Sequence, residues 1–432
     1  RVAPDGSVVF PALTGSLRPL LKAPSDGSTP AVELFPPVSG ALNLLEIVGA
    51  HALYSTSAGG TSELRSVPLA GGTTTLLNPP PFDTPIARIG AHPGGADVLF
   101  LSEGGLPGMT RLFTVPIDGS ALPRLLSGSM IASGDAREFD ASAGTHVVYR
   151  ADASNNESFE LFGAPHAGGA ALRLSPPLAP GPVLGDVEEF RVTADGERVL
   201  YLADQDEDGA LGLYLTPSDA RGTPRRLDAG LPETNDVFDG FVTTADGRHV
   251  VFLKANSLGS ANGHLYAVDL ATGGTPRLLD ATTAKYVQEL VLDPQATRVF
   301  YIGRRPFQNG WDLLTARLDG SLPPDVLNLP TGAVDAFRIT PDGATAVYRA
   351  DQSTTGVLEL YSVATDGSAA PQKVNTTPVA GGGVTLFELS PDGTRVVYLS
   401  ERDVDDEFEL YSAPSDASAP ALELNPPHVS GG

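Results

Sequence analysis

The sequence repeats itself with a period of about 48 residues, and this feature limits the folds open to the chain more than any other. The best preserved copies are Phe387–Ser400, Phe337–Ala350 and Phe190–Ala203. Each holds an Asp-Gly pair near its centre and then a short β-branched and aromatic run. Weaker copies bring the total to about nine, and the first, Val2–Phe10, is truncated. Because repeated units bury their core against their neighbours, we expect a single repeat domain over residues 1–432.

Each copy has the pattern of four short strands. The Asp-Gly pairs combine a residue that tolerates positive φ with one that favours it, which tight antiparallel turns require. Runs such as His249–Lys254 are rich in β-branched and aromatic residues, as buried strands are, and Phe408–Tyr411 alternates like a half-buried strand. No stretch of ten or more residues shows the apolar face of a helix. The chain is therefore predicted to be all-β.

Equal units of four antiparallel strands without helices favour a β-propeller. We predict a single propeller of four-stranded antiparallel blades with nine repeat units, of which eight are complete and one is partial. The first copy lacks its innermost strand, so a ring of eight blades remains the alternative.

The segments Ser390–Gly393, Val396–Ser400 and Glu409–Tyr411 form a series that resembles the WD40-like propeller repeats of the TolB family. The resemblance extends over essentially the whole chain and implies the propeller fold. It implies no particular activity, because such blades occur in periplasmic TolB, in surface proteins and in the non-catalytic propellers of prolyl-oligopeptidase-like enzymes. The chain departs from TolB in blade number, which is six in that family, and in lacking a helical N-terminal domain, so a Tol–Pal role is not implied.

The charge balance makes nucleic acid an unexpected partner. The chain has 28 Lys and Arg against 52 Asp and Glu, and its formal net charge of −24 repels phosphate backbones and anionic lipid surfaces. It contains no cysteine, and no run of about 18 apolar residues predicts a transmembrane helix. The chain begins at Arg1 in the middle of a motif, which leaves room for a removed export signal.

The best chemical motif is an Asp-x-Asp-x-Asp-Gly series formed by Asp204, Asp206, Asp208 and Gly209. Three carboxylates at this spacing suit a hard cation such as Ca²⁺, and glycine permits the sharp turn between them. The twelfth position is Leu215 rather than the glutamate of an EF-hand, so only a propeller-loop type of calcium site is predicted. The alternative is an acidic hairpin tip that faces water.

A second group of charged residues falls on the first strands, which lie nearest the axis of a propeller and therefore line its central channel. Such a channel is either a ligand or peptide site or a water-filled passage with internal salt bridges. The group consists of Glu138, Glu189, Glu289, Asp335, Glu388, Arg137, Arg191 and Arg338. The seven histidines are scattered, and the sequence has neither a Gly-x-Ser-x-Gly elbow nor a phosphate-binding loop.

These observations predict a non-enzymatic, secreted or cell-surface propeller, with a periplasmic location as the alternative. We expect it to act as a scaffold whose partner is another protein or another copy of itself, joined through the incomplete first unit. The alternatives are a ligand-binding sensor and a channel-sited hydrolase or lyase with paired carboxylates such as Glu188 and Glu189. Neighbouring strand residues point to opposite faces, which argues against that particular pair.

Overall fold

The fold was analysed in a computed structural model. It describes residues 1–12, 17–24, 29–39, 41–58, 60–92, 94–141, 144–177, 186–206, 209–231, 237–255, 263–280, 286–304, 310–379, 382–401 and 408–425. The chain divides into two compact units: unit 1 is Arg1–Arg226 and unit 2 is Leu227–Gly432. The prediction of a single domain closed into one ring stays a prediction.

Unit 1 holds five sheets, and the described elements are all strands. They are β1 (Ser7–Pro11), β2 (Leu17–Pro24), β3 (Val32–Ser39), β4 (Ala41–Val48), β5 (His51–Ala58), β6 (Thr61–Pro68), β7 (Thr75–Leu76), β8 (Ile86–Ala91), β9 (Asp97–Ser102), β10 (Arg111–Pro116), β11 (Arg124–Leu125), β12 (Ala136–Asp140), β13 (His146–Asn155), β14 (Ser158–Pro165), β15 (Leu172–Arg173), β16 (Val187–Val192), β17 (Arg198–Ala203), β18 (Gly212–Pro217) and β19 (Arg225–Arg226).

Unit 2 holds four sheets built in the same way. Its described strands are β20 (Val237–Thr243), β21 (His249–Ala255), β22 (Gly263–Asp269), β23 (Arg277–Leu278), β24 (Tyr286–Leu292), β25 (Arg298–Arg304), β26 (Asp312–Arg317), β27 (Asp325–Val326), β28 (Val334–Ile339), β29 (Thr345–Ala350), β30 (Glu359–Ala364), β31 (Gln372–Lys373), β32 (Val384–Leu389), β33 (Arg395–Ser400), β34 (Glu409–Pro414) and β35 (Leu422–Glu423).

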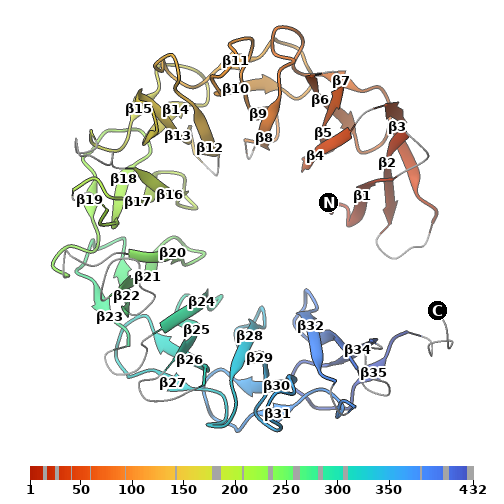
Figure 1. The fold of residues 1–432 in the computed structure, drawn as a ribbon, viewed down its shortest axis with the longest axis vertical. Helices are drawn as coiled ribbons and strands as arrows, with labels where there is room; N and C mark the ends of the chain where they lie inside the picture. Colours follow the sequence, from red (N-terminus) through yellow and green to blue (C-terminus); the bar gives the residue numbers. More distant parts are fainter. Residues whose placement is uncertain are drawn as a thin grey trace. The chain divides into compact units, whose positions relative to one another are not determined.

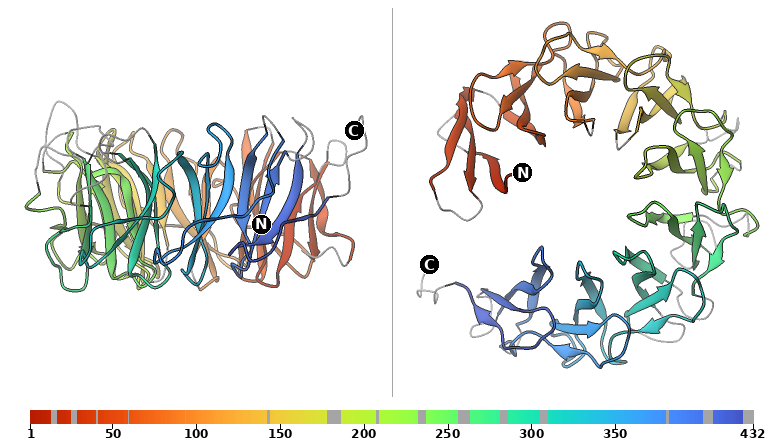
Figure 2. Two further views of the ribbon diagram at one scale, coloured as in Figure 1. Left: turned by 90° about the horizontal axis from the view of Figure 1, so that it is seen from below. Right: turned by 180° about the vertical axis from the view of Figure 1, so that it is seen from behind.

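The nine sheets confirm the predicted all-β propeller blades. Eight sheets have four strands in sequence order, and the sheet β1-β2-β3 has three. The missing strand is the innermost one, as predicted, and only the isolated bridge between Val2 and Val8 marks its place. Within each unit the first strands of the sheets lie on its inner side and the last strands on its outer side (Figure 1). Neighbouring strands run in opposite directions, but within each unit their axes are roughly aligned, so the turns lie at the two faces of the unit (Figure 2).

The Asp-Gly pairs form the first hairpin turn of a blade, as the sequence predicts. In the turn at Asp342, the carboxylate accepts hydrogen bonds from the Thr340 hydroxyl at 2.6 Å and from the Ala344 amide at 3.0 Å, while Gly343 adopts a φ of 70°. The Thr340 hydroxyl bond is the main reason that the pKa of Asp342 is lowered. A side chain that bonds its own turn in this way fixes the register of the two strands it joins.

The aromatic residues of the repeat form a stacked pair in six of the nine described sheets. The second and third strands pair Tyr398 with Tyr411, and their rings stack with centroids 5.3 Å apart. Tyr348 and Tyr361 repeat this arrangement at 5.6 Å. Offset stacking of this kind adds about 1 kcal/mol to the burial of each pair. The repeated aromatic positions therefore hold strands together inside the sheet.

The hydrophobic core lies between neighbouring sheets. In unit 2, for example, Val251 and Leu265 of one sheet form a single buried cluster with Tyr301 and Leu314 of the next. A sheet with a neighbour on each side within its unit thus buries both faces, which is the packing that the β-branched runs predict. Within the described residues, no helix is long and apolar enough to cross a membrane.

Candidate functional site

The first strand of a blade carries a β-bulge near its beginning. In β24, Gln288 pairs with Ile302 and Val291 pairs with Phe300, so that two residues oppose Tyr301 alone. A bulge redirects the side chains that it contains. The bulge residue Glu289 has a φ of 54°, in the left-handed region that a residue with a side chain seldom adopts. Such outliers collect at functional sites, and this one lies on an inner strand of unit 2.

Arg338 of β28 joins two glutamates that belong to the neighbouring sheets. Its Nη1 lies 3.3 Å from Oε1 of Glu289 in β24. Its Nε and Nη2 donate to the two carboxylate oxygens of Glu388 in β32, at 3.2 and 3.0 Å. The guanidinium carbon also lies 5.6 Å from the centre of the Phe387 ring. Three predicted channel residues from three successive blades therefore form one cluster.

The two glutamates of this cluster have pKa values that move in opposite directions. Partial burial raises the pKa of Glu289, against the opposing charge of Arg338 and with a smaller contribution from Asp335. The hydrogen bonds from Arg338 lower the pKa of Glu388. The Glu289 side chain is 33% exposed and that of Glu388 is 73% exposed, which fits the stronger desolvation of Glu289. Two carboxyl groups whose pKa values are shifted apart in this way can serve as acid and base at one pH.

A small cavity of about 170 Å³ lies beside Glu289. Phe241, Val242 and Leu253 form part of its wall, together with the backbone neighbours of Glu289. These apolar walls account for the partial desolvation of the carboxyl group. A substrate group bound there would meet the Glu289 side chain on a surface with little competing water.

The remaining predicted channel residue of unit 2, Asp335, has a structural partner. Nε and Nη2 of Arg349 donate to its two oxygens at 2.9 and 2.7 Å. The same guanidinium donates to the backbone oxygens of Val384 and Thr385 in the next sheet. Asp335 thereby orients an arginine that ties two blades together, and we do not place it in the reacting group.

In unit 1 the predicted channel residues border a cavity of about 540 Å³, whose lining includes Arg88, Glu138, Asp140, Glu189 and Arg191. Here each glutamate has an arginine of its own: Glu138 lies 3.0 Å from Arg150, and Glu189 lies 2.9 Å from Arg191. The structure therefore does not bring these carboxylates together around a shared cation, as it does in unit 2.

Two further predictions for the channel of unit 1 concern Arg137 and the pair Glu188–Glu189. Arg137 forms an ion pair with Glu157 of the turn between β13 and β14, with Nη2 and Oε2 3.0 Å apart. Glu188 stands at the bulge between Val187 and Glu189, so strict alternation does not hold there. Glu189 is nevertheless committed to Arg191, and the Glu188–Glu189 pair is not the site that the geometry favours.

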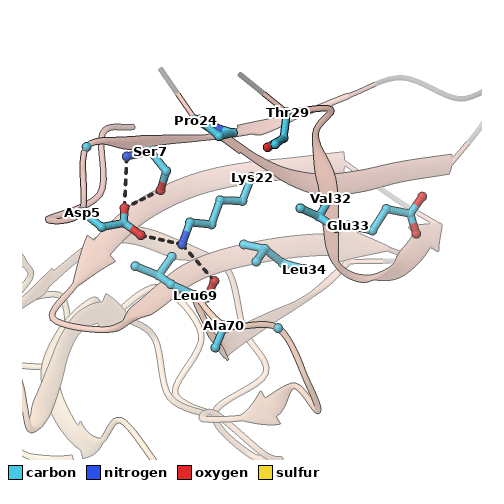
Figure 3. A pocket seen from close by; sticks show the side chains of 12 residues that line it. Asp5, Ser7, Lys22, Pro24, Thr29, Val32, Glu33, Leu34, Leu69 and Ala70 are labelled. Atoms are coloured by element: carbon cyan, nitrogen blue, oxygen red, sulfur yellow. Dashed lines mark hydrogen bonds and ion pairs between the residues drawn. The ribbon is translucent and has the colours of Figure 1, made fainter. Parts of the chain in front are cut away.

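A third cavity, of about 510 Å³, lies between the sheet β1-β2-β3 and the turn after β6 (Figure 3). Lys22 crosses it, with Nζ 2.7 Å from Oδ2 of Asp5 and 3.2 Å from the backbone oxygen of Leu69. Asp5 also accepts hydrogen bonds from the amide and hydroxyl of Ser7. These bonds, that of Lys22 first, lower the pKa of Asp5. The polar groups of Asp5, Ser7 and Lys22 bond one another and the Leu69 backbone oxygen. We therefore interpret this cavity as a packing contact between two sheets rather than as a binding site.

The predicted calcium loop is described in part, because Asp208 lies outside the described residues. Asp204 accepts the Asp186 amide at 2.5 Å and the Gly209 amide at 3.2 Å. Asp206 accepts the Tyr214 hydroxyl at 2.9 Å and lies 3.3 Å from Nη1 of Arg226. Among the described residues no group of three or more His, Asp or Glu side chains could hold a metal ion. Calcium binding by Asp204, Asp206 and Asp208 stays a prediction.

The role of Asp204 recurs in other blades, which sequence reasoning missed. Asp351 accepts the Ala333 amide at 2.6 Å and the Gly356 amide at 3.0 Å, as Asp204 does with its own neighbours. Asp152 likewise accepts the amides of Asp135 and Glu157. The signal for this repeated structural role was an aspartate that follows an alanine near the end of the second strand, within β13 for Asp152 and directly after β17 and β29 for Asp204 and Asp351.

The sequence matches no protein-family model and no curated protein, whereas many solved structures share its fold. A eukaryotic initiation factor is 10% identical over 97% of this chain and 96% of its own, with a TM-score of 0.56. Dipeptidyl peptidase 4 from Porphyromonas gingivalis is 11% identical over 88% of this chain, with a TM-score of 0.54, and this chain covers 58% of its length. A protein named as a TolB of Agrobacterium tumefaciens is 21% identical over 56% of this chain and 81% of its own, with a TM-score of 0.33.

These comparisons correct one prediction from the sequence. The chain was predicted not to be an enzyme, and the match to a dipeptidyl peptidase contradicts this, because the same type of propeller occurs in enzymes. The lack of a hydrolase motif in the sequence was therefore no ground for excluding enzymatic activity. The resemblance to TolB-like propeller repeats is confirmed as a likeness of fold: the chain is built from propeller blades of four antiparallel strands.

Proposed function

We propose that this protein is an acid–base enzyme of the hydrolase or lyase class, with its reacting groups at the inner edge of unit 2. The observation that carries the proposal is the cluster in which Arg338 joins Glu289 and Glu388 from the two neighbouring sheets, and the opposite directions of the two glutamate pKa shifts support it. Two carboxyl groups, one with a raised pKa that acts as the acid and one with a lowered pKa that acts as the base, are what glycosidases use to cleave a glycosidic bond. We therefore favour a glycoside as the substrate.

Each member of the cluster has a distinct role in this proposal. Glu289 is the general acid that donates a proton to the leaving oxygen, since its partial burial favours the protonated form. Glu388 is the base, which takes a proton from water in a hydrolase or from a carbon atom of the substrate in a lyase. Arg338 keeps Glu388 ionised and holds both carboxyl groups at fixed positions. The cavity beside Glu289 receives the leaving group.

The test is a screen of glycosides and esters, with and without added Ca²⁺, followed by the variants Glu289→Gln and Glu388→Gln. General acid–base catalysis contributes about 100-fold to 10,000-fold, so each variant should lose at least about 100-fold in kcat on a substrate with a poor leaving group. With a leaving group that needs no proton, Glu289→Gln should recover most of its activity while Glu388→Gln should not. Loss of the Glu289 carboxyl should also remove the alkaline limb of the pH–rate profile.

Glu188→Gln is the matched control, because it removes a first-strand carboxylate of unit 1 that is outside the cluster. It should leave turnover unchanged. The proposal is wrong if no substrate of either class is turned over, or if turnover survives intact in both Glu289→Gln and Glu388→Gln. The calcium arm tests the Asp204 loop separately, since activity that depends on Ca²⁺ should lose that dependence in Asp204→Asn.

We further propose that the protein is exported, to the cell surface, the surroundings or the periplasm, and that it associates with itself or another protein through β1. The absence of cysteine supports export, and the lack of a regular fourth strand beside β1 supports strand addition there, where an incoming strand would replace the backbone bonds of Arg1 and Ala3 to Val9 and Ser7. Light scattering at high protein concentration is the test of self-association. A homogeneous monomer would contradict it.

A further inference from the structure

One position of the repeat, most often occupied by proline, carries a charged residue in two adjacent sheets of unit 2. The last residue of the third strand, which pairs with the first residue of the second strand, is proline in six of the nine sheets. The two residues at this place in the neighbouring sheets are Asp269, paired with His249, and Arg317, paired with Arg298. The six prolines are Pro24, Pro68, Pro116, Pro165, Pro217 and Pro414.

Asp269 and Arg317 are among the residues that line a cavity of about 560 Å³ between the two sheets. Its lining includes four arginines: Arg248, Arg277, Arg298 and Arg317. A second cavity of about 340 Å³ shares His249, Asp269, Arg277 and Leu318 with the first, so the two form one continuous cleft. We call it the arginine cleft. It lies at the hairpin end of β21, β22, β25 and β26, away from the inner strands that carry Glu289 and Arg338.

Two of the four arginines pair with a carboxylate. Nη2 of Arg248 lies 3.2 Å from Oδ2 of Asp269, and Nη1 of Arg298 lies 3.9 Å from Oδ2 of Asp325, which is a longer and weaker contact. Arg277 donates to the backbone oxygen of Leu318 at 3.4 Å, which is a bond to a neutral acceptor.

The neighbouring turn fixes Arg277 further. Gly320 has a φ of 60°, and a Cβ atom there would lie 2.8 Å from Cδ of Arg277. The Arg277 stem therefore rests on the glycine backbone of the next sheet. Hydrogen bonds from Ser321 lower the pKa of Asp319, and the charges of Arg317 and Arg277 add to this effect, which shows that both guanidinium groups lie near one carboxylate.

The residues that line the arginine cleft carry more positive than negative charges, whereas the protein as a whole is negatively charged. The lining residues include four arginines against two aspartates, Asp269 and Asp319, and Asp325 pairs with Arg298 from outside the lining, within a chain whose net charge is −24. The buried Nδ1 of His249 has no hydrogen-bond partner among the described residues, so the protein does not use this nitrogen. Surplus positive charge in a concave site is the feature that attracts and retains small anions.

We propose that the arginine cleft binds a small, multiply charged oxyanion of the phosphate ester or pyrophosphate class. The planar guanidinium fork matches two oxygens of a phosphate at once, and several such forks around one cavity favour a ligand with more than one negative charge. The volume of the cleft suits a small molecule rather than a polymer. The binding is a second function, independent of the proposed acid–base site.

The proposal is tested by isothermal titration of the full chain with pyrophosphate and inorganic phosphate at low salt. Pyrophosphate should bind more tightly than phosphate, and its affinity should fall as salt is added. Arg317→Ala and Arg277→Ala should each weaken pyrophosphate binding at least about tenfold, since each removes a charge-assisted hydrogen bond. Titration with a sugar phosphate then separates an ester ligand from free pyrophosphate.

Arg395→Ala is the matched control. Arg395 begins β33, as Arg298 begins β25, but its guanidinium donates to the hydroxyl and backbone oxygen of Ser412 at 2.7 and 3.1 Å. Arg395→Ala removes one positive charge at the repeat position that Arg298 occupies in its own sheet, and it should leave pyrophosphate binding unchanged. Absence of pyrophosphate binding in the unmodified protein overturns the proposal, and so does equal affinity in Arg317→Ala, an exposed variant whose fold circular dichroism can verify.

Discussion

Replacing Asp280 by asparagine should stabilise the protein, and increasingly so as the pH rises. Asp280 is fully buried, and its Oδ1 accepts the Leu265 amide at 2.8 Å. Its other oxygen, Oδ2, has no hydrogen-bond partner among the described residues. Burial raises the pKa of Asp280 from 3.8 to about 8. The folded protein therefore holds a neutral carboxyl group here across a pH range in which the unfolded chain is ionised.

Other blades show that asparagine fits this position. Asn328 and Asn375 accept the amide of the third strand at 2.9 and 2.8 Å through Oδ1, as Asp280 does. Their amide nitrogens donate to backbone oxygens, of Leu329 in one case and Thr376 in the other. The Asp280→Asn substitution would therefore keep the geometry and remove only the titration.

The size of the effect follows from proton linkage. Because the pKa of the folded state lies above that of the unfolded state, the free energy of unfolding falls as the pH rises from about 4 to about 8. Each pH unit in this window costs about 1.4 kcal/mol. From pH 3.8 to pH 7, about 3 units, the penalty reaches at most about 4 kcal/mol. Asp280→Asn should match the unmodified protein near pH 4 and exceed it by a growing margin up to pH 8.

Urea unfolding at a series of pH values, followed by the fluorescence of the single tryptophan, Trp311, measures this margin. Trp311 packs against the core between the next two sheets of the same unit, so it reports the unfolding of unit 2. His264 needs its own control, since its Nδ1 lies 3.4 Å from Oδ1 of Asp280 and its charge would favour the carboxylate. The growing margin should persist in a His264→Gln background. A margin that does not change between pH 4 and pH 8 would refute the reasoning.

Two further substitutions test the charge pairs and the turns of unit 2. Lys254 and Asp228 form a buried ion pair with Nζ and Oδ2 2.6 Å apart, so Lys254→Met should remove the positive charge that faces the buried Asp228 carboxylate and lower the free energy of unfolding by about 3 to 5 kcal/mol in a denaturant titration. Gly320→Ala should destabilise by about 1 kcal/mol or more, and it should also weaken pyrophosphate binding, because the new Cβ displaces Arg277. Normal binding in a folded Gly320→Ala variant would contradict the second expectation.

The blade architecture was predictable because its signals are local. An Asp-Gly pair such as Asp342–Gly343 specifies its own turn, and the alternation beside it specifies the strands that the turn joins. The truncated first copy likewise predicted the three-stranded sheet. Each of these inferences needs only about ten consecutive residues, and the repeat confirms it by appearing again.

The candidate site was predictable only as a list of residues. Glu289, Arg338 and Glu388 could be assigned to first strands, but they lie 49 and 50 positions apart, and their contact depends on how neighbouring blades pack. The bulge that gives Glu289 its positive φ depends on the register with β25, which the strand pattern does not encode. The structural role of Asp204 could not be predicted for a related reason, since its amide partners come from just before a different strand and from beyond the turn.

Departures from the repeat locate the unusual chemistry of this protein. Residues that recur in blade after blade, such as the stacked tyrosines, have the same structural role in each one, so they say little about function. Asp280 stands where other blades have asparagine, and Arg317 stands where most have proline. Glu289 adds a left-handed bulge residue. All three lie in the two adjacent sheets β20-β21-β22-β23 and β24-β25-β26-β27 or directly after them. Burial of a carboxyl group, backbone strain and like charges each cost stability, and their concentration in one pair of blades is the pattern expected of a region kept for binding or chemistry rather than for folding.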